Sequence, residues 1–242
     1  MEKLSFGLKS SLFLILLIMI VSTTSLFWSA AGLEEAVNNN LYHVVSTYTT
    51  SFNLQEANRV QNIKVAAQKL DGILLTPGET VSFNQVVGPR TKERGFKEAL
   101  EIINGEFVEG IGGGVCQVSS TLYNAALLAN LKIITRQPHS RPVDYVDLGR
   151  GATVYYGQLD FQFKNNTDTP LMVITQINED QITVSLMGRR RGPQIRIKTK
   201  ILEIREPEVK KEFSPELNAG KKEIIQTGRQ GYKVEVRRLV RQ

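Results

Sequence analysis

A long apolar stretch near the N-terminus differs from the rest of the chain and is not expected to belong to the packed core of a globular domain. Lys3 and Lys9 precede it, and it runs for 17 residues from Leu12 to Trp28. A basic flank followed by an apolar run is typical of a secretion signal, and this length is near the lower limit for a spanning helix. We predict a single-pass membrane anchor over residues 1–32, with the main domain outside the cytoplasm. The small residues 29–31 leave a cleaved signal, and hence secretion, as the alternative.

Composition indicates a globular domain behind this segment. Hydrophobic residues make up 41% of the chain and charged residues 22%, as in ordinary globular proteins. Cys116 is the single cysteine, so an exported chain of this kind has no intramolecular disulfide and depends on its hydrophobic core. One cysteine and two histidines are too few for a zinc site. We therefore predict no metal and no cofactor.

Charge is spread unevenly along the chain. From Arg189 to the end there are 16 Lys/Arg against 7 Asp/Glu, whereas the rest of the chain is slightly acidic. A basic segment outside the membrane is suited to anionic wall polymers or lipid head groups, with a merely solvated surface as the alternative. Nucleic acid is not expected as a partner, because the chain is exported and the basic segment has no interleaved aromatic motif.

Hydrophobic periodicity predicts two helices. Asn53 and Glu56 resemble a capping box, and a helical stripe follows them: Val60, Ile63, Ala67 and Leu70. A glycine loop leads into a second helix near Cys116, with its own apolar stripe: Val118, Leu122, Ala125, Ala126 and Ala129.

Strand signals surround these helices. The Asn104-Gly105 pair between apolar runs predicts a hairpin. Alternating residues over 152–164, then 171–177 and 181–187, predict three consecutive strands of an antiparallel meander. The resulting fold class is α+β, with helices packed on a mainly antiparallel sheet, preceded by the membrane helix and followed by a small β-rich tail.

The second helix and its loop suggest a cysteine nucleophile. Cys116 at a helix N-terminus should have a lowered pKa, and the glycine loop leaves backbone N–H groups free to serve as an oxyanion hole. His139 is the candidate base and Asp160 the candidate orienting acid, with Asp144 and Asp147 as alternatives. The opposing interpretation is a buried, inert cysteine and a histidine that bonds within its loop.

A set of polar residues suggests binding instead of catalysis. Arginines and a glycine loop suit recognition of a carboxylate or phosphate. The candidate residues are Arg59, Arg90, Arg150, Gly112, Gly113, Gly114, Gln117, Ser119 and Ser120. Alternatively, the arginines brace loops against backbone carbonyls.

Several motifs together resemble the VanW-like family over residues 48–188. They include Leu75–Glu79, Gly110–Leu122, His139-Ser140 and the stretch from Gly157 to Thr167. The resemblance implies a bacterial cell-envelope setting at peptidoglycan. The chain is thus divided into the anchor over 1–32, a tether over 33–47, the VanW-like domain over 48–188 and a basic segment over 189–242. Through Leu217, Gly220-Lys221, Gln226–Gly228 and Gly231-Tyr232, this basic segment is similar to part of a G-five module.

Three hypotheses follow for the function. The first is a cysteine-dependent peptidoglycan amide hydrolase or transferase that acts on stem peptides. The second is a non-catalytic module that binds peptidoglycan or an anionic wall polymer. The third is a membrane-associated scaffold for other envelope proteins.

Overall fold

The structure is a computed structural model that describes residues 40–241, except 42, 104, 208, 210, 219, 226 and 227. The membrane anchor predicted over residues 1–32 lies outside this part, as do residues 33–39 of the predicted tether. Within the described part of the chain, no helix is long and apolar enough to cross a membrane.

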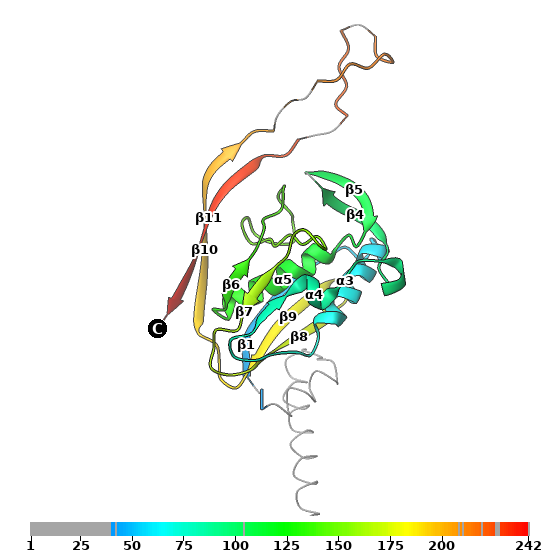
Figure 1. Cartoon of the computed structure of the whole chain (residues 1–242). Coiled ribbons are helices and arrows are strands. Elements are labelled where there is room, and N and C mark those ends of the chain that lie inside the picture. The colour runs from blue at the N-terminus through cyan, green and yellow to red at the C-terminus, as the bar shows by residue number, and fades with distance from the viewer. Residues whose placement is uncertain are drawn as a thin grey trace, which may run out of the picture.

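The central sheet is antiparallel and has four strands in the order β1-β9-β8-β2 (Figure 1). The strands are β1 (His43–Ser51), β2 (Ile73–Leu75), β8 (Leu171–Asn178) and β9 (Gln181–Gly188). β8 and β9 form a hairpin, so the alternation predicted both strands correctly. β1 pairs with the other edge of β9, and residues 43–47, which we assigned to the tether, therefore begin a core strand.

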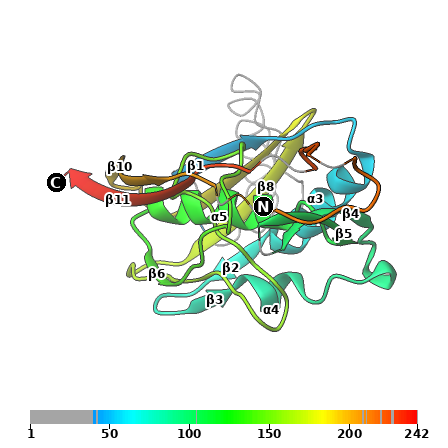
Figure 2. The ribbon, with the colours of Figure 1, turned by 90° about the horizontal axis from the view of Figure 1, so that it is seen from above.

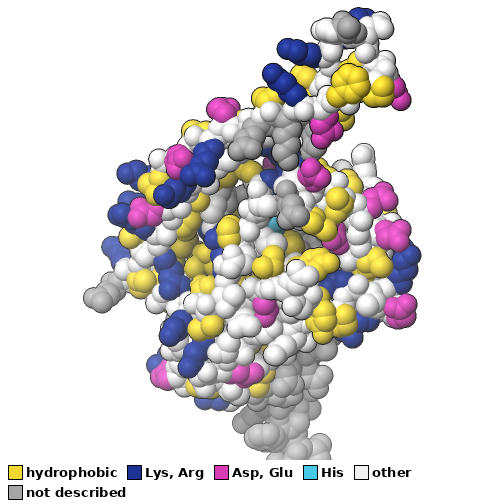
Figure 3. All heavy atoms as spheres, turned by 45° about the horizontal axis from the view of Figure 1, so that its top comes forward, with side chains coloured by type: hydrophobic (Ala, Val, Ile, Leu, Met, Phe, Trp, Pro, Cys, Tyr) yellow, Lys and Arg dark blue, Asp and Glu magenta, His cyan; other side chains and the backbone are white. Residues whose placement is uncertain are grey.

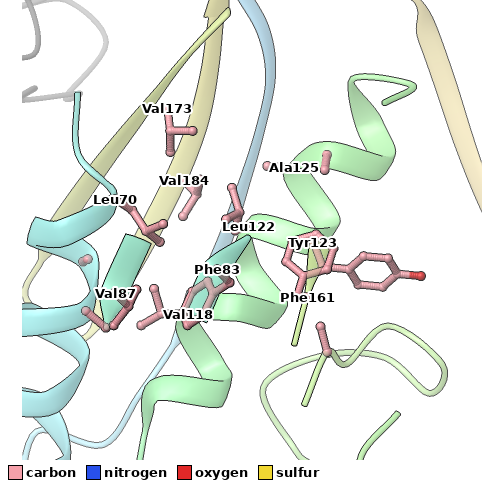
Figure 4. Packing of buried hydrophobic residues seen from close by; sticks show 14 of the residues in the cluster. Leu70, Phe83, Val87, Val118, Leu122, Tyr123, Ala125, Phe161, Val173 and Val184 are labelled. Atoms are coloured by element: carbon pink, nitrogen blue, oxygen red, sulfur yellow. The ribbon is translucent and has the colours of Figure 1, made fainter. Parts of the chain in front are cut away.

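Two long helices, α3 (Ala57–Leu70) and α5 (Val115–Leu128), cover one face of this sheet. α5 lies over β1, where Ser46 Oγ donates to the Ala125 carbonyl oxygen at 2.7 Å. α3 lies over β8, where Thr175 Oγ1 donates to the Ala67 carbonyl oxygen at 3.0 Å. Both predicted apolar stripes are buried between helices and sheet, and Figure 4 shows Leu70, Val118, Leu122, Val173 and Val184 meeting there. Burial of this apolar surface is the main force that holds the layers together.

The start of α3 differs from the prediction. Asn53 Oδ1 accepts a hydrogen bond from the Gln55 backbone N–H at 3.0 Å, and the N-cap residue Glu56 makes no side-chain capping bond. The predicted capping box is therefore wrong, because the Asn53 side chain closes a local turn before the helix begins.

Three smaller sheets surround this core. β3 (Thr80–Ser82), β7 (Gln162–Lys164) and β6 (Lys132–Thr135) form a sheet in the order β3-β7-β6. β4 (Glu98–Ile103) and β5 (Glu106–Ile111) form the hairpin that Asn104-Gly105 predicted. β10 (Gln194–Arg205) and β11 (Gly231–Arg241) form a long ribbon. Two short helical segments, α4 (Phe83–Val87) and the 3₁₀ turn η1 (Lys92–Arg94), lie between β3 and β4.

The three-strand meander predicted over residues 152–187 is wrong in its first strand. β7 pairs with β3 and β6, not with β8. The fully buried Asn165 explains the change of sheet. Its Nδ2 donates to the carbonyl oxygens of Leu75 at 3.0 Å and Thr169 at 2.9 Å, which fixes the chain where it leaves β7.

The predicted α+β class is also wrong. Strands account for 39% of the described residues and helices for only 18%. Among the described residues, only α3 and α5 are long helices, whereas the predicted hairpin β4–β5 and the predicted β-rich tail add four strands to the sheets. The fold is therefore mainly β, with two long helices on one of its sheets.

The β10–β11 ribbon runs along the body of the domain (Figure 1), and the view from above shows it beside α5 (Figure 2). Arg238 donates to the Leu131 carbonyl oxygen at 2.8 Å, and Ile197 packs against the core. Gly149 lies so close to β11 that an added Cβ would be 2.5 Å from a methyl carbon of Val236. The predicted strand-like character of the tail is thus confirmed, and part of the ribbon packs on the domain.

One buried amide joins the elements that position the start of α5. Asn62 of α3 has no exposed surface. Its Oδ1 accepts from the Lys97 N–H at 2.7 Å, and its Nδ2 lies 2.9 Å from each of the carbonyl oxygens of Lys97 and Gly113. The Asn62 side chain therefore connects α3 to Lys97, the residue before β4, and to Gly113 of the glycine loop.

The substitution Asn62→Ala should lower the free energy of unfolding by about 2–3 kcal/mol, because it removes three hydrogen bonds of a fully buried amide and leaves the Lys97 N–H and the Gly113 carbonyl oxygen without this partner. Urea denaturation monitored by circular dichroism measures the change. Asn58→Ala on the same helix is the control, since Asn58 is exposed and makes one bond to the Glu98 carbonyl oxygen, and it should change stability by less than about 1 kcal/mol. Equal losses in the two variants would contradict this role of Asn62.

Candidate functional site

The glycine loop Gly112–Gly114 sets the position of the α5 N-terminus. Gly114 is the N-cap residue, in the left-handed region at φ 106°. A Cβ on Gly113 would lie 2.5 Å from the Leu100 carbonyl oxygen, which leaves no room for a side chain. The loop backbone therefore packs directly against β4, and Cys116 follows as the second residue of the helix.

The Cys116 thiol is bonded to the backbone of Val154. Sγ lies 3.4 Å from the Val154 carbonyl oxygen, to which it donates, and 3.5 Å from the Val154 nitrogen, which donates to it. Burial raises the pKa of the thiol, and the Val154 N–H and the charge of Arg90 oppose this only in part. The lowered pKa that we predicted from the helix N-terminus is thus outweighed by desolvation, and the neutral thiol is favoured.

His139 is bonded to Tyr145 instead of to Cys116. The Tyr145 hydroxyl lies 3.1 Å from His139 Nε2, and the two rings meet edge to face. Burial, with the positive charge of Arg136, lowers the pKa of His139 to about 4. A Cβ on Gly151 would be 2.4 Å from His139 Nδ1, so the imidazole is pressed against the backbone. His139 is neutral at physiological pH, and its described side-chain hydrogen bond is with Tyr145, not with the thiol.

Tyr145 is a site residue that the sequence analysis missed. Burial raises its pKa, the charge at Cys116 raises it further, and a hydrogen bond with Ser120 acts in the opposite direction. Its ring also lies 5.9 Å from the guanidinium carbon of Arg59. Tyr145 therefore lies close to the thiol and is bonded to the histidine. Only its place in an irregular stretch after His139 could have drawn attention to it.

The carboxylate of Asp160 is bonded to residues other than Cys116 and His139. It accepts from Ser82 Oγ at 2.6 Å, from the Asn84 N–H at 2.9 Å and from Gln162 Nε2 at 2.9 Å. These bonds fix the start of α4. Of the alternatives, Asp144 faces Arg229 at 3.6 Å, on the β11 side. Within the described residues, none of these acids is bonded to His139.

The polar residues along α5 hold the segment that leads to Val154. Ser119 Oγ donates to the Ala152 carbonyl oxygen at 2.5 Å, and the Ala152 N–H donates to Ser120 Oγ at 2.9 Å. Asn124, which we did not single out, bonds both the side chain and the carbonyl oxygen of Arg150. The side chains of Ser119, Ser120, Asn124 and Arg150 are buried. Ser119, Ser120 and Arg150 therefore brace the fold instead of facing a ligand.

Two of the predicted arginines lie on either side of the glycine loop. A Cβ on Gly112 would be 2.9 Å from Cγ of Arg90, and a Cβ on Gly114 would be 3.0 Å from Cγ of Arg59. Arg59 donates to Gln117 Oε1 at 2.5 Å, and Gln117 in turn donates to the Ser51 carbonyl oxygen at 2.8 Å. The start of α5 is therefore flanked by two arginine side chains.

Arg90 is partly committed to its own loop. It donates to the Gly88 carbonyl oxygen and to Asn84 Oδ1, both at 2.8 Å, and its guanidinium lies 5.8 Å from the Tyr156 ring centre. Burial lowers the pKa of Arg90. Burial also raises the pKa of Glu101, with Arg90 opposing. Arg59 also forms an ion pair with Glu56, whose Oε2 lies 3.3 Å from Arg59 Nε, so each of the two arginines has one acidic neighbour.

Comparison with known proteins identifies this region. The family model described as VanW like protein matches residues 58–187, more than half of the chain. The chain belongs to the VanW-like family. The resemblance predicted from the sequence is thereby confirmed, and all the candidate site residues lie within the match. Residues 189–242 lie beyond it, so their similarity to a G-five module stays a prediction.

Two relatives support this assignment. The chain is 48% identical over 126 residues to the uncharacterized protein YoaR of Bacillus subtilis strain 168, covering 52% of this chain and 42% of the relative. It is 32% identical over 145 residues to the vancomycin B-type resistance protein VanW of Enterococcus faecalis strain ATCC 700802 / V583, covering 56% of this chain and 51% of the relative. The chain thus spans about half the length of these relatives or less. No solved structure matches it.

His139 should make stability depend on pH between its unfolded pKa of about 6.5 and its folded value of about 4. As the pH falls through this window, the unfolded chain binds a proton that the folded chain excludes, so stability falls by about 2–3 kcal/mol. Urea unfolding at about pH 7 and about pH 4.5 measures the loss. His139→Gln should lose less, and an identical loss in both proteins would contradict a neutral, desolvated His139.

Proposed function

We propose that this chain works in the bacterial cell envelope, at peptidoglycan, as a module that binds a carboxylate group at the start of α5. The envelope setting is taken from the family and from a relative whose name describes vancomycin B-type resistance. The observation that carries the proposal is the pair Arg59 and Arg90 on the two sides of Gly112–Gly114.

The chemistry of this pair suits a carboxylate. A guanidinium group binds a carboxylate through two parallel N–H bonds, and the partial positive charge of a helix N-terminus adds to the attraction. The half-buried carboxylate of Glu101 has a raised pKa, and the Glu56 carboxylate that pairs with Arg59 is 52% exposed, so these two acids neutralise the arginines only in part. A stem-peptide terminus of peptidoglycan carries the negative charge that this site requires.

Several contacts favour binding over catalysis. Sγ of Cys116 is hydrogen-bonded to the Val154 backbone, and the neutral His139 is bonded to Tyr145. The Asp160 carboxylate accepts a hydrogen bond from Ser82, at the start of α4. A cysteine-dependent amide hydrolase or transferase would need His139 to leave Tyr145 and approach the thiol. That activity, like the scaffold hypothesis, stays a prediction.

A second contact with the wall is proposed for the ribbon. Figure 3 shows Lys and Arg side chains gathered along one flank of the molecule, and basic residues recur along both strands: Arg196, Lys198, Lys200, Arg237, Arg238 and Arg241. Such a surface attracts anionic wall polymer. Together with the membrane anchor proposed for residues 1–32, it would keep the main domain outside the cytoplasm and close to the wall.

Peptide binding tests the proposed function. The full chain should bind a stem pentapeptide with a free C-terminal carboxylate about tenfold more tightly than the same peptide with a C-terminal amide, because the amide lacks the charge that the arginines recognise. Isothermal titration calorimetry measures both affinities. Arg59→Gln should remove most of the difference between the two peptides.

The control removes a positive charge elsewhere. Arg190 is exposed and pairs with the exposed Asp168, so Arg190→Gln should leave the preference for the carboxylate unchanged. Equal affinity of the wild-type chain for the acid and the amide would remove the basis of the proposal. So would equal behaviour of the two arginine variants.

A further inference from the structure

A rigid turn carries two tyrosines, and one of them, Tyr156, lies beside Arg90. In residues Tyr155–Leu159, the Tyr155 N–H donates to the Leu159 carbonyl oxygen at 2.8 Å, and the Leu159 N–H donates to the Tyr155 carbonyl oxygen at 2.9 Å. Gly157 takes the left-handed conformation at φ 79°, which closes the turn. Asn84 Nδ2 donates to the Leu159 carbonyl oxygen at 2.8 Å and anchors the turn to α4. The backbone beneath the aromatic rings is therefore fixed.

The two rings are unusually open for aromatic side chains. Tyr155 is 47% exposed and Tyr156 is 49% exposed, and Leu159 beside them is 37% exposed. Aromatic side chains contribute most to stability when they are buried, so rings held open on a rigid turn are available to a ligand.

The turn is continuous with the proposed carboxylate site. Val154, which holds the Cys116 thiol, directly precedes it. The guanidinium of Arg90 lies 5.8 Å from the Tyr156 ring centre. Cγ of the same side chain lies so close to Gly112 that an added Cβ there would be 2.9 Å away. A ligand bound at the glycine loop could therefore extend along Arg90 onto Tyr156.

This combination fits a sugar ring. One face of a pyranose carries C–H groups that pack on an aromatic ring through dispersion forces, and its hydroxyl rim needs hydrogen-bond partners at the edge. Tyr156 offers the face, while Arg90, the exposed Gln158 and the hydroxyl of the exposed Tyr155 offer the partners. We propose that the Tyr155–Leu159 turn binds a pyranose ring of a β-linked N-acetylated glycan, next to the carboxylate site. The inference rests on the proposed function, because the glycan is the part of peptidoglycan to which the stem peptide is joined.

The test uses a neutral probe that lacks any peptide, a tetrasaccharide of β-1,4-linked N-acetylglucosamine. The full chain should bind it saturably by isothermal titration calorimetry. Tyr156→Leu keeps apolar bulk but removes the flat ring, and should weaken binding about tenfold, whereas Tyr156→Phe should stay within about twofold. Phe213→Ala removes a ring that is 93% exposed on the segment between β10 and β11, and should have no effect.

The outcomes separate this inference from the proposed function. Saturable binding that is lost in Tyr156→Leu and kept in Tyr156→Phe supports it. Lack of binding to the tetrasaccharide, or equal binding by Tyr156→Leu and the wild type, overturns it even if the stem pentapeptide binds. A loss of pentapeptide binding in Tyr156→Leu, without any sugar binding, would assign the turn to peptide recognition and also overturn the proposal. Sugar binding without carboxylate preference would support the turn and reject the arginine site.

Discussion

The close packing of the Gly112–Gly114 backbone between α3 and β4 is the contact on which the rest of the site depends. Gly113 has no space for a Cβ beneath Leu100, and Asn62 bonds both the loop and Lys97. This contact sets where α5 begins. The first turns of α5 then hold the segment before Val154 through Ser119 and Ser120. Loop, helix and the surrounding segments are therefore fixed as one unit.

Desolvation determines the protonation states of Cys116 and His139 around the glycine loop. The same enclosure that orders the residues raises the pKa of Cys116 and lowers that of His139, so both are favoured in their neutral forms. A cysteine–histidine catalytic pair works through the charged forms. Arg59 and Arg90 keep their charges, opposed in part by Glu56 and Glu101, and they favour binding of an anionic group.

The sequence predicted correctly those helices and turns that short-range interactions determine. The stripe from Val60 to Leu70, the Asn104-Gly105 hairpin and the helix after the glycine loop all follow from short-range periodicity or turn chemistry. The division of strands among sheets could not be predicted, because it depends on long-range contacts such as Asn165 with Leu75. For the same reason the sequence did not reveal that Tyr145 bonds His139, or that Asp160 is engaged by Ser82. The arginines were identified because their residue type suits an anion, but their placement around the loop required the fold.

The most direct test of this account is the rate of Cys116 alkylation by iodoacetamide as a function of pH, on the native full chain. A desolvated thiol held by Val154 should react slowly near neutral pH, with an apparent pKa above the ordinary value of about 8.5, and should become fully reactive on denaturation. Fast reaction with an apparent pKa well below that value, reversed by His139→Ala, would contradict the account. It would show an activated thiolate and make catalysis the better interpretation of this site.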